Sequence, residues 1–192
     1  ETFDALSHLQ QAGNIRQIGV SNFAAWQVMK AQAVAAKLGT RIDILQPMYS
    51  LVKRQAEVEL FPMARSEDIA VASYSPLGGG LLTGKYRTGG SGRLLSDTRY
   101  AARYGQEWMH DTAAALADLA AETGADPATL AVAWAAKNPA VTAPIISARN
   151  TDQLMPSLKA QSVTLSDAEY QRIEALSPRP APATDRLEEA DD

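Results

Sequence analysis

A short apolar run followed by a glycine-rich loop carries the side chains best suited to chemistry in this sequence. The run 69–74 holds no charged residue and ends on Tyr74, which is typical of a strand buried on both faces. The loop continues from Ser75 through three consecutive glycines to Lys85. Glycine backbone N–H groups can approach an anion closely, the lysine adds a positive charge, and the tyrosine offers a flat ring. The stretch predicts a site for a flat, phosphate-bearing ligand, although an ordinary flexible surface loop is the alternative.

Polar residues stand just after each of the other expected strands as well. They are Ser21-Asn22, Tyr49-Ser50 and Ser147–Arg149. In parallel sheets the carboxyl ends of the strands form the functional edge. We therefore expect these residues to meet Tyr74-Ser75 at one rim.

Helices and strands alternate along most of the chain. Helices are expected at 2–12, 24–38, 55–66, 106–123, 128–137, 151–160 and 165–176, and strands at 15–20, 42–49, 69–74 and 141–146. Ser21 and Asn22 are good caps for the helix 24–38, and Ser166 with Glu169 fits a capping box. Such alternation indicates an α/β fold with a parallel sheet, which is either an open doubly wound sheet or part of a (β/α)8 barrel. The first strand lacks the G-x-G-x-x-G signature of a Rossmann fold.

Two segments fall outside this alternation. Residues 75–105 form an expected long loop, which in a compact domain is usually functional or disordered. Residues 177–192 are rich in proline and then acidic, so we expect a mobile tail after a domain at 1–176. The chain starts with Glu1 inside a helical pattern, and we expect it to be a truncated chain.

Composition excludes several classes of function. The formal net charge is -4 and the sequence has no basic stripe, so neither nucleic acid nor a polybasic membrane contact is expected. The 192 residues contain no cysteine, which excludes disulfides and thiolate metal sites. Two histidines without clustered carboxylates make a metal site improbable. The tryptophans and tyrosines are expected to fill the core or a groove, and these are Trp26, Trp108, Trp134, Tyr49, Tyr86, Tyr100 and Tyr104.

Four short motifs, each at the end of an expected strand, together carry a family resemblance. They are the segments 18–23 (IGVSNF), 45–50 (LQPMYS), 74–78 (YSPLG) and 147–154 (SARNTDQL). In this order and spacing they resemble the aldo-keto reductases, and the likeness runs from about Ala5 to Leu176. The resemblance implies a (β/α)8 TIM barrel, of which this chain would supply strands five to eight with their helices. It also implies an NADPH-dependent, cytoplasmic enzyme that reduces aldehydes or ketones to alcohols.

The same resemblance implies a cofactor site along the strand ends. Ser21, Asn22 and Gln46 would hold the nicotinamide carboxamide. Their side chains can form hydrogen bonds with both its donor and its acceptor groups. Tyr74 would stack on the nicotinamide ring.

The resemblance extends this site along the rest of the dinucleotide. The pyrophosphate path would be lined by Ser75, Leu77, Gly79 and Leu81, with Lys85 nearby. Arg149 would meet the 2′-phosphate, which favours NADP(H). Ser147 could share that phosphate, and Gln153 would touch the adenine.

No catalytic residue is assigned. The family's catalytic Asp, Tyr, Lys and His belong upstream of the matched segment, and their motifs are not found here. Besides the reductase, two alternatives are open: a non-catalytic NADP(H)-binding half-barrel, and an unrelated phosphate-binding barrel enzyme. Four strands of a barrel would leave unpaired edges and an uncovered face, so we also expect such a chain to self-associate.

Overall fold

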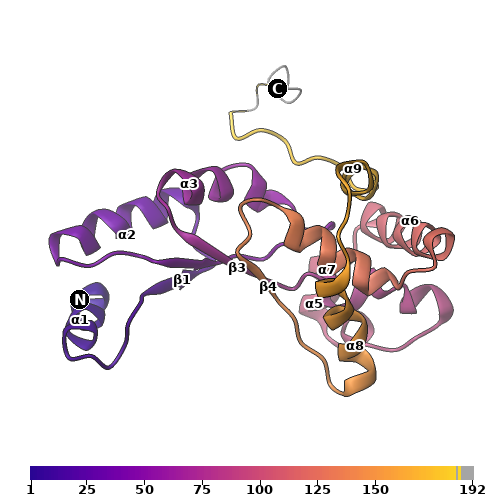
Figure 1. The fold of residues 1–192 in the computed structure, drawn as a ribbon, viewed down its shortest axis with the longest axis horizontal. Helices are drawn as coiled ribbons and strands as arrows, with labels where there is room; N and C mark the ends of the chain where they lie inside the picture. The colour runs from indigo at the N-terminus through magenta and orange to yellow at the C-terminus, as the bar shows by residue number, and fades with distance from the viewer. Residues whose placement is uncertain (185, 187–192) are drawn as a thin grey trace.

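In the part of the chain that the structure describes, four short parallel strands form one sheet in the order β1-β2-β3-β4. The computed structural model describes residues 1–184 and residue 186. The strands are β1 (Gly19–Ser21), β2 (Ile44–Gln46), β3 (Ala70–Tyr74) and β4 (Ala143–Ile145). Sequential strands are neighbours, and helical segments connect them, as the crossover rule for parallel strands requires (Figure 1). The parallel α/β sheet is therefore confirmed.

The main helices follow the predicted positions closely. They are α1 (Thr2–Gln11), α2 (Ala25–Lys37), α3 (Leu60–Ser66), α6 (Glu107–Thr123), α7 (Pro127–Lys137), α8 (Thr151–Lys159) and α9 (Asp167–Glu174). One prediction was wrong in form, because the helix expected at 55–66 is divided into a 3₁₀ turn, η1 (Gln55–Glu57), and α3. At the N-cap of α3, Glu59 has φ -130°, which is outside the helical range. Helices α1 and α6 lie at opposite ends of the molecule (Figure 1).

Residues 75–105 are not the continuous loop that the sequence suggested. They form four short helical segments: η2 (Gly78–Thr83), η3 (Lys85–Thr88), α4 (Arg93–Ser96) and α5 (Thr98–Tyr104). Apolar side chains from these segments enter the core, and Leu81, Leu82, Leu94 and Tyr104 are buried. Burial of these side chains is what orders the segment, which glycine content alone did not reveal.

The sheet is covered on one face and open on the other. Along β3, Val71 and Ser73 are buried, whereas Ala70, Ala72 and Tyr74 are only partly buried. On β4, Pro144 is partly buried, whereas Ala143 and Ile145 are exposed, Ile145 to 40%. The expectation that 69–74 is buried on both faces was thus wrong, since side chains of alternate residues point to opposite faces and only one face meets the helices.

The covered face continues into an aromatic core around Trp134. This indole is fully buried and stacks between Tyr49 and Tyr170, with ring centroids 5.1 and 5.8 Å away. Trp108 is half-buried against the core. Trp26 contradicts its expected packing role, because it lies on the outer side of α2 and is 65% exposed. The first residue of the expected tail, Ser177, is buried, while residues 185 and 187–192 of that tail lie outside the described residues.

Candidate functional site

The carboxyl ends of β1, β2 and β3 bring predicted site residues to one edge of the sheet. Ser21 is paired with Gln46 in the register of β1 and β2. Past the end of β2, Met48 forms a bridge with Tyr74, and the Tyr74 N–H donates to the Pro47 carbonyl at 2.9 Å. The sheet therefore places the ends of three strands next to one another.

A chain of side-chain hydrogen bonds joins these strand ends. The Tyr74 hydroxyl donates to Asn22 Oδ1 at 2.7 Å. Asn22 Nδ2 donates to Ser21 Oγ at 3.1 Å, and the Ser21 hydroxyl donates to the Gln46 backbone carbonyl at 2.8 Å. Ser21, Asn22 and Gln46 are exposed. The polar groups that form these hydrogen bonds are therefore accessible to a ligand.

Two residues of this edge have unusual backbone conformations. Asn22 has φ +58° and Ser75 has φ +60°, in the left-handed region that non-glycine residues seldom adopt. Asparagine tolerates this region better than most residues, and such strain is concentrated at binding sites. The N-cap of α2 is Ala24, and Gln27 accepts from the Ala24 N–H at 2.8 Å. The prediction that Ser21 and Asn22 cap this helix was wrong, and the reason is that their side chains bond to the sheet.

The glycine-rich segment after β3 lies against the tyrosines of α5. Gly79 has φ +65°, and a Cβ atom there would lie 2.8 Å from Tyr100 and 2.9 Å from Tyr104. Only a residue without a side chain fits this close approach. Leu77 is half-buried, whereas Leu81 is 2% exposed. Leu81 therefore belongs to the core.

Positive side chains gather around the two tyrosines of α5. Lys53 lies over the Tyr104 ring at 5.7 Å, and Arg93 and Arg103 lie over the Tyr100 ring at 5.3 and 5.6 Å. Burial, helped by the charge of Arg103, lowers the pKa of Lys53. Within residues 1–184 and 186, none of these three cations forms an ion pair with a carboxylate. The segment after β3 therefore presents uncompensated positive charge, which favours an anionic ligand.

Lys85 is placed at the far end of this glycine-rich segment. Its Nζ lies 5.0 Å from the Tyr86 ring centroid, and a Cβ atom on Gly80 would lie 3.4 Å from it. The ammonium group thus sits close to the glycine backbone, as the sequence predicted.

The loop after β4 holds the remaining predicted residues. Asn150 caps α8 by accepting from the Gln153 N–H at 3.0 Å, and Gln153 Oε1 accepts from the Arg149 N–H at 3.4 Å. Ser147 and Arg149 are exposed. The Arg149 guanidinium makes no hydrogen bond or ion pair with any residue in the described part of the chain, so it is available to a ligand.

A buried polar cluster behind the strand ends was not predicted from the sequence. The Arg54 side chain is 6% exposed and pairs with Glu57 and with Glu174 of α9, both at 2.9 Å. Glu57 also accepts from the Tyr49 hydroxyl at 2.7 Å, and burial followed by the Glu57 charge raises the pKa of Tyr49. The cluster fastens α9 to the segment that follows β2. Because Arg54 and Glu174 are 120 residues apart, no spacing in the sequence could indicate the cluster.

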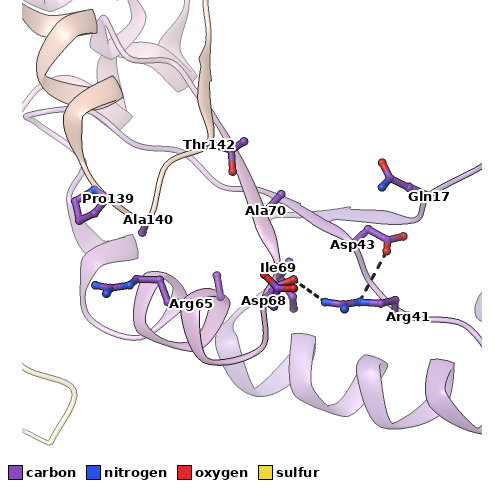
Figure 2. A pocket seen from close by; sticks show the side chains of 11 residues that line it. Gln17, Arg41, Asp43, Arg65, Asp68, Ile69, Ala70, Pro139, Ala140 and Thr142 are labelled. Atoms are coloured by element: carbon purple, nitrogen blue, oxygen red, sulfur yellow. Dashed lines mark hydrogen bonds and ion pairs between the residues drawn. The ribbon is translucent and has the colours of Figure 1, made fainter. Parts of the chain in front are cut away.

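The opposite end of the sheet carries a hollow of about 540 Å³ lined by polar residues (Figure 2). Two of its charged side chains, Arg41 and Asp43, are already engaged in the structure. Arg41 Nη2 donates to the carbonyls of Glu67 and Asp68 at 2.9 and 2.6 Å, and Asp43 accepts from the Ile18 N–H at 2.8 Å. These contacts tie together the starts of β1, β2 and β3, so this hollow has a structural explanation.

Two kinds of site are missing from the part of the chain that the structure describes. Residues 1–184 and 186 contain no group of three His, Asp or Glu side chains that could hold a metal ion. In the same residues, no helix has the length and apolar character that crossing a membrane requires.

Known proteins resemble this chain over almost all of its length. Protein tas of Escherichia coli (strain K12) is 37% identical over 179 residues, which is 92% of this chain and 52% of the relative. The uncharacterized oxidoreductase YrpG of Bacillus subtilis (strain 168) is 36% identical over 188 residues, or 96% of this chain and 56% of the relative. Human aflatoxin B1 aldehyde reductase member 4 is 42% identical over 88 residues, or 45% of this chain and 27% of the relative.

The chain thus spans about half the length of the curated relatives that it matches most fully. Residues 1–178 match the sequence profile of the aldo/keto reductase family. This span includes all four strands and the polar edge that they form. The chain belongs to the aldo/keto reductase family.

Proposed function

We propose that this chain is the cofactor-binding half of an NADPH-dependent oxidoreductase that reduces aldehydes or ketones to alcohols. Its four strands would be strands five to eight of the family's (β/α)8 barrel. The observation that carries the proposal is the hydrogen-bonded chain linking Tyr74, Asn22, Ser21 and Gln46 across three neighbouring strand ends. Four residues assigned to one ligand are here joined to one another.

The nicotinamide end of the cofactor would lie over this hydrogen-bonded chain. Asn22, Ser21 and the exposed Gln46 side chain offer the donors and acceptors that a carboxamide requires. Tyr74 ends β3 beside them, where its ring can stack on the nicotinamide, a contact worth about 0.5–1.5 kcal/mol beyond the area buried.

The phosphates would follow the segment after β3 toward the loop after β4. Ser75, Leu77, Gly79 and Lys85 would line the pyrophosphate path. Lys53 and Arg103 lie beside this path and form no ion pair within the described residues, which supports an anionic ligand. The exposed Arg149 side chain would bind the 2′-phosphate together with Ser147, and Gln153 would contact the adenine.

When bound, NADPH would supply the hydride for carbonyl reduction, and this chain's own residues would bind and orient it. We assign no proton donor to the chain. The open face of the sheet would form part of the barrel's inner wall, above which a small carbonyl substrate would lie. We place the enzyme in the cytoplasm.

NADPH titration of the purified chain tests this proposal. We expect saturable binding by calorimetry that weakens in Asn22→Ala and in Tyr74→Ala. Asn14→Ala is the matched control, because Asn14 is exposed between α1 and β1 and its side chain makes no hydrogen bond within the described residues. An absence of NADPH binding, or an equal loss in Asn14→Ala and Asn22→Ala, would overturn the proposal.

A further inference from the structure

The hydrogen-bonded chain at the strand ends has a fixed direction, because it terminates on a carbonyl oxygen. The Gln46 backbone carbonyl can only accept, so the single proton of the Ser21 hydroxyl must point to it. Ser21 Oγ then has only lone pairs to offer its other neighbour. It follows that the Asn22 atom at 3.1 Å must be the donor, Nδ2.

This logic fixes the Asn22 side-chain amide as well. With Nδ2 toward Ser21, Oδ1 faces Tyr74, and the Tyr74 hydroxyl must donate to it at 2.7 Å. The flipped amide would place Oδ1 against Ser21 Oγ, whose proton is already engaged, so that two acceptors would face each other. Tyr74 and Ser21 therefore hold Asn22 in one orientation from both sides.

One donor remains for a ligand when this orientation is set. Asn22 Nδ2 has two protons and uses one for Ser21, which leaves one N–H on an exposed side chain. The left-handed backbone of Asn22, with φ +58°, restrains the residue further. An outward N–H held in this way matches a carbonyl oxygen on the ligand.

We propose that the hydroxyl of Tyr74 is a positioning group, which orients Asn22 so that its free N–H meets the carbonyl oxygen of the nicotinamide carboxamide. The identity of this ligand rests on the function proposed above. Ring stacking by Tyr74 and orientation by its hydroxyl are then two separate contributions. The first needs only the ring, whereas the second acts entirely through Asn22.

A double-mutant cycle separates the two contributions. Tyr74→Phe keeps the ring, and we expect it to weaken NADPH binding about two- to tenfold, the size of one neutral hydrogen bond. In an Asn22→Ala background, the same Tyr74→Phe change is expected to have no further effect. Tyr170→Phe is the control, because it removes a hydroxyl from α9 in the aromatic core and should leave the dissociation constant unchanged. A loss of equal size in both backgrounds would overturn the inference.

A measurement without cofactor keeps this inference distinct from the proposed function. The side-chain amide of Asn22 gives ¹H–¹⁵N signals in an NMR spectrum of the 192-residue chain. Tyr74→Phe should shift these signals, while Tyr170→Phe should not. Unchanged Asn22 signals in Tyr74→Phe would refute the positioning role even if NADPH binds. Shifted signals without any NADPH binding would support the orienting contact and refute the cofactor assignment.

Discussion

Replacing Arg54 by methionine is expected to destabilise the fold strongly, because it leaves two carboxylates without their common partner. The Arg54 side chain is 6% exposed, that of Glu57 is 19% exposed and that of Glu174 is 35% exposed. Methionine fills a similar volume and supplies neither the charge nor the hydrogen bonds. The perturbation thus removes the contact that joins α9 to the segment after β2 and leaves most of the packing in place.

The burial of the three groups sets the expected size of the effect. Removing one partner of a buried ion pair typically costs about 3–5 kcal/mol, because a buried charge is left unpaired. Glu174 is a third exposed and can be solvated by water, so we expect the lower end, about 3 kcal/mol. For a domain of this size that corresponds to a fall in Tm of roughly 6–12 °C.

Urea unfolding followed by circular dichroism measures the change. Arg99→Met is the matched control, since Arg99 pairs with Asp97 on the surface and its side chain is 83% exposed. We expect the control to lie within about 0.5 kcal/mol of the wild type. A cost below about 1 kcal/mol for Arg54→Met, or equal costs for the two variants, would refute the reasoning about burial.

Four further outcomes follow from particular contacts. Arg149→Ala should weaken NADPH binding about tenfold or more, because it removes a charge-assisted contact, and should leave NADH binding unchanged. Equal losses for the two cofactors in parallel titrations would exclude Arg149 as the residue that binds the 2′-phosphate. Gly79→Ala should lower the free energy of unfolding in urea by about 1–3 kcal/mol, because the new Cβ atom would clash with the α5 tyrosines. Gly89→Ala is the control and should cost less, because Gly89 has a similar φ but a Cβ atom there would meet nothing within 4 Å. Equal costs would argue against the clash. Burial, followed by the charge of Glu174, raises the pKa of Tyr170 to about 12. The stability that its neutral hydroxyl contributes is complete below pH 10 and is lost as the pH rises toward 12. In urea unfolding, the free energy of unfolding should therefore fall less steeply with alkaline pH in Tyr170→Phe than in the wild type. The same fall in both proteins would contradict this. Finally, the open sheet face and the unpaired strand edges should make the 192-residue chain self-associate in size-exclusion chromatography, and a stable monomer would count against this.

Local sequence signals predicted the main helices and the parallel sheet. The capping box before α9 forms as expected, with the Ser166 N–H donating to Glu169 Oε2 at 2.7 Å. Asp126 likewise caps α7 by accepting from the Ala128 N–H at 2.8 Å. These motifs act within a few residues, so the sequence contains all of the information that they need.

The meeting of the candidate site residues at one edge of the sheet was predictable, and their contacts were less so. Parallel strands bring their carboxyl ends to one edge, which was enough to group Ser21, Asn22 and Tyr74 before their contacts were known. Gln46 was added by the family resemblance. The role of Ser21 and Asn22 as helix caps was wrong, because bonds to Gln46 and Tyr74 compete with capping and prevail. The Arg54 cluster escaped prediction, since it depends on chain segments that meet only in the folded protein.

The most direct test of the central claim is an NMR titration of the isotope-labelled chain with NADPH, read residue by residue. We predict saturable shifts concentrated at Asn22, Gln46, Tyr74 and Arg149, with little change at Arg41 and Asp43 at the opposite end of the sheet. Shifts confined to that opposite end, or an absence of saturable shifts at the strand ends, would contradict a nicotinamide nucleotide site there.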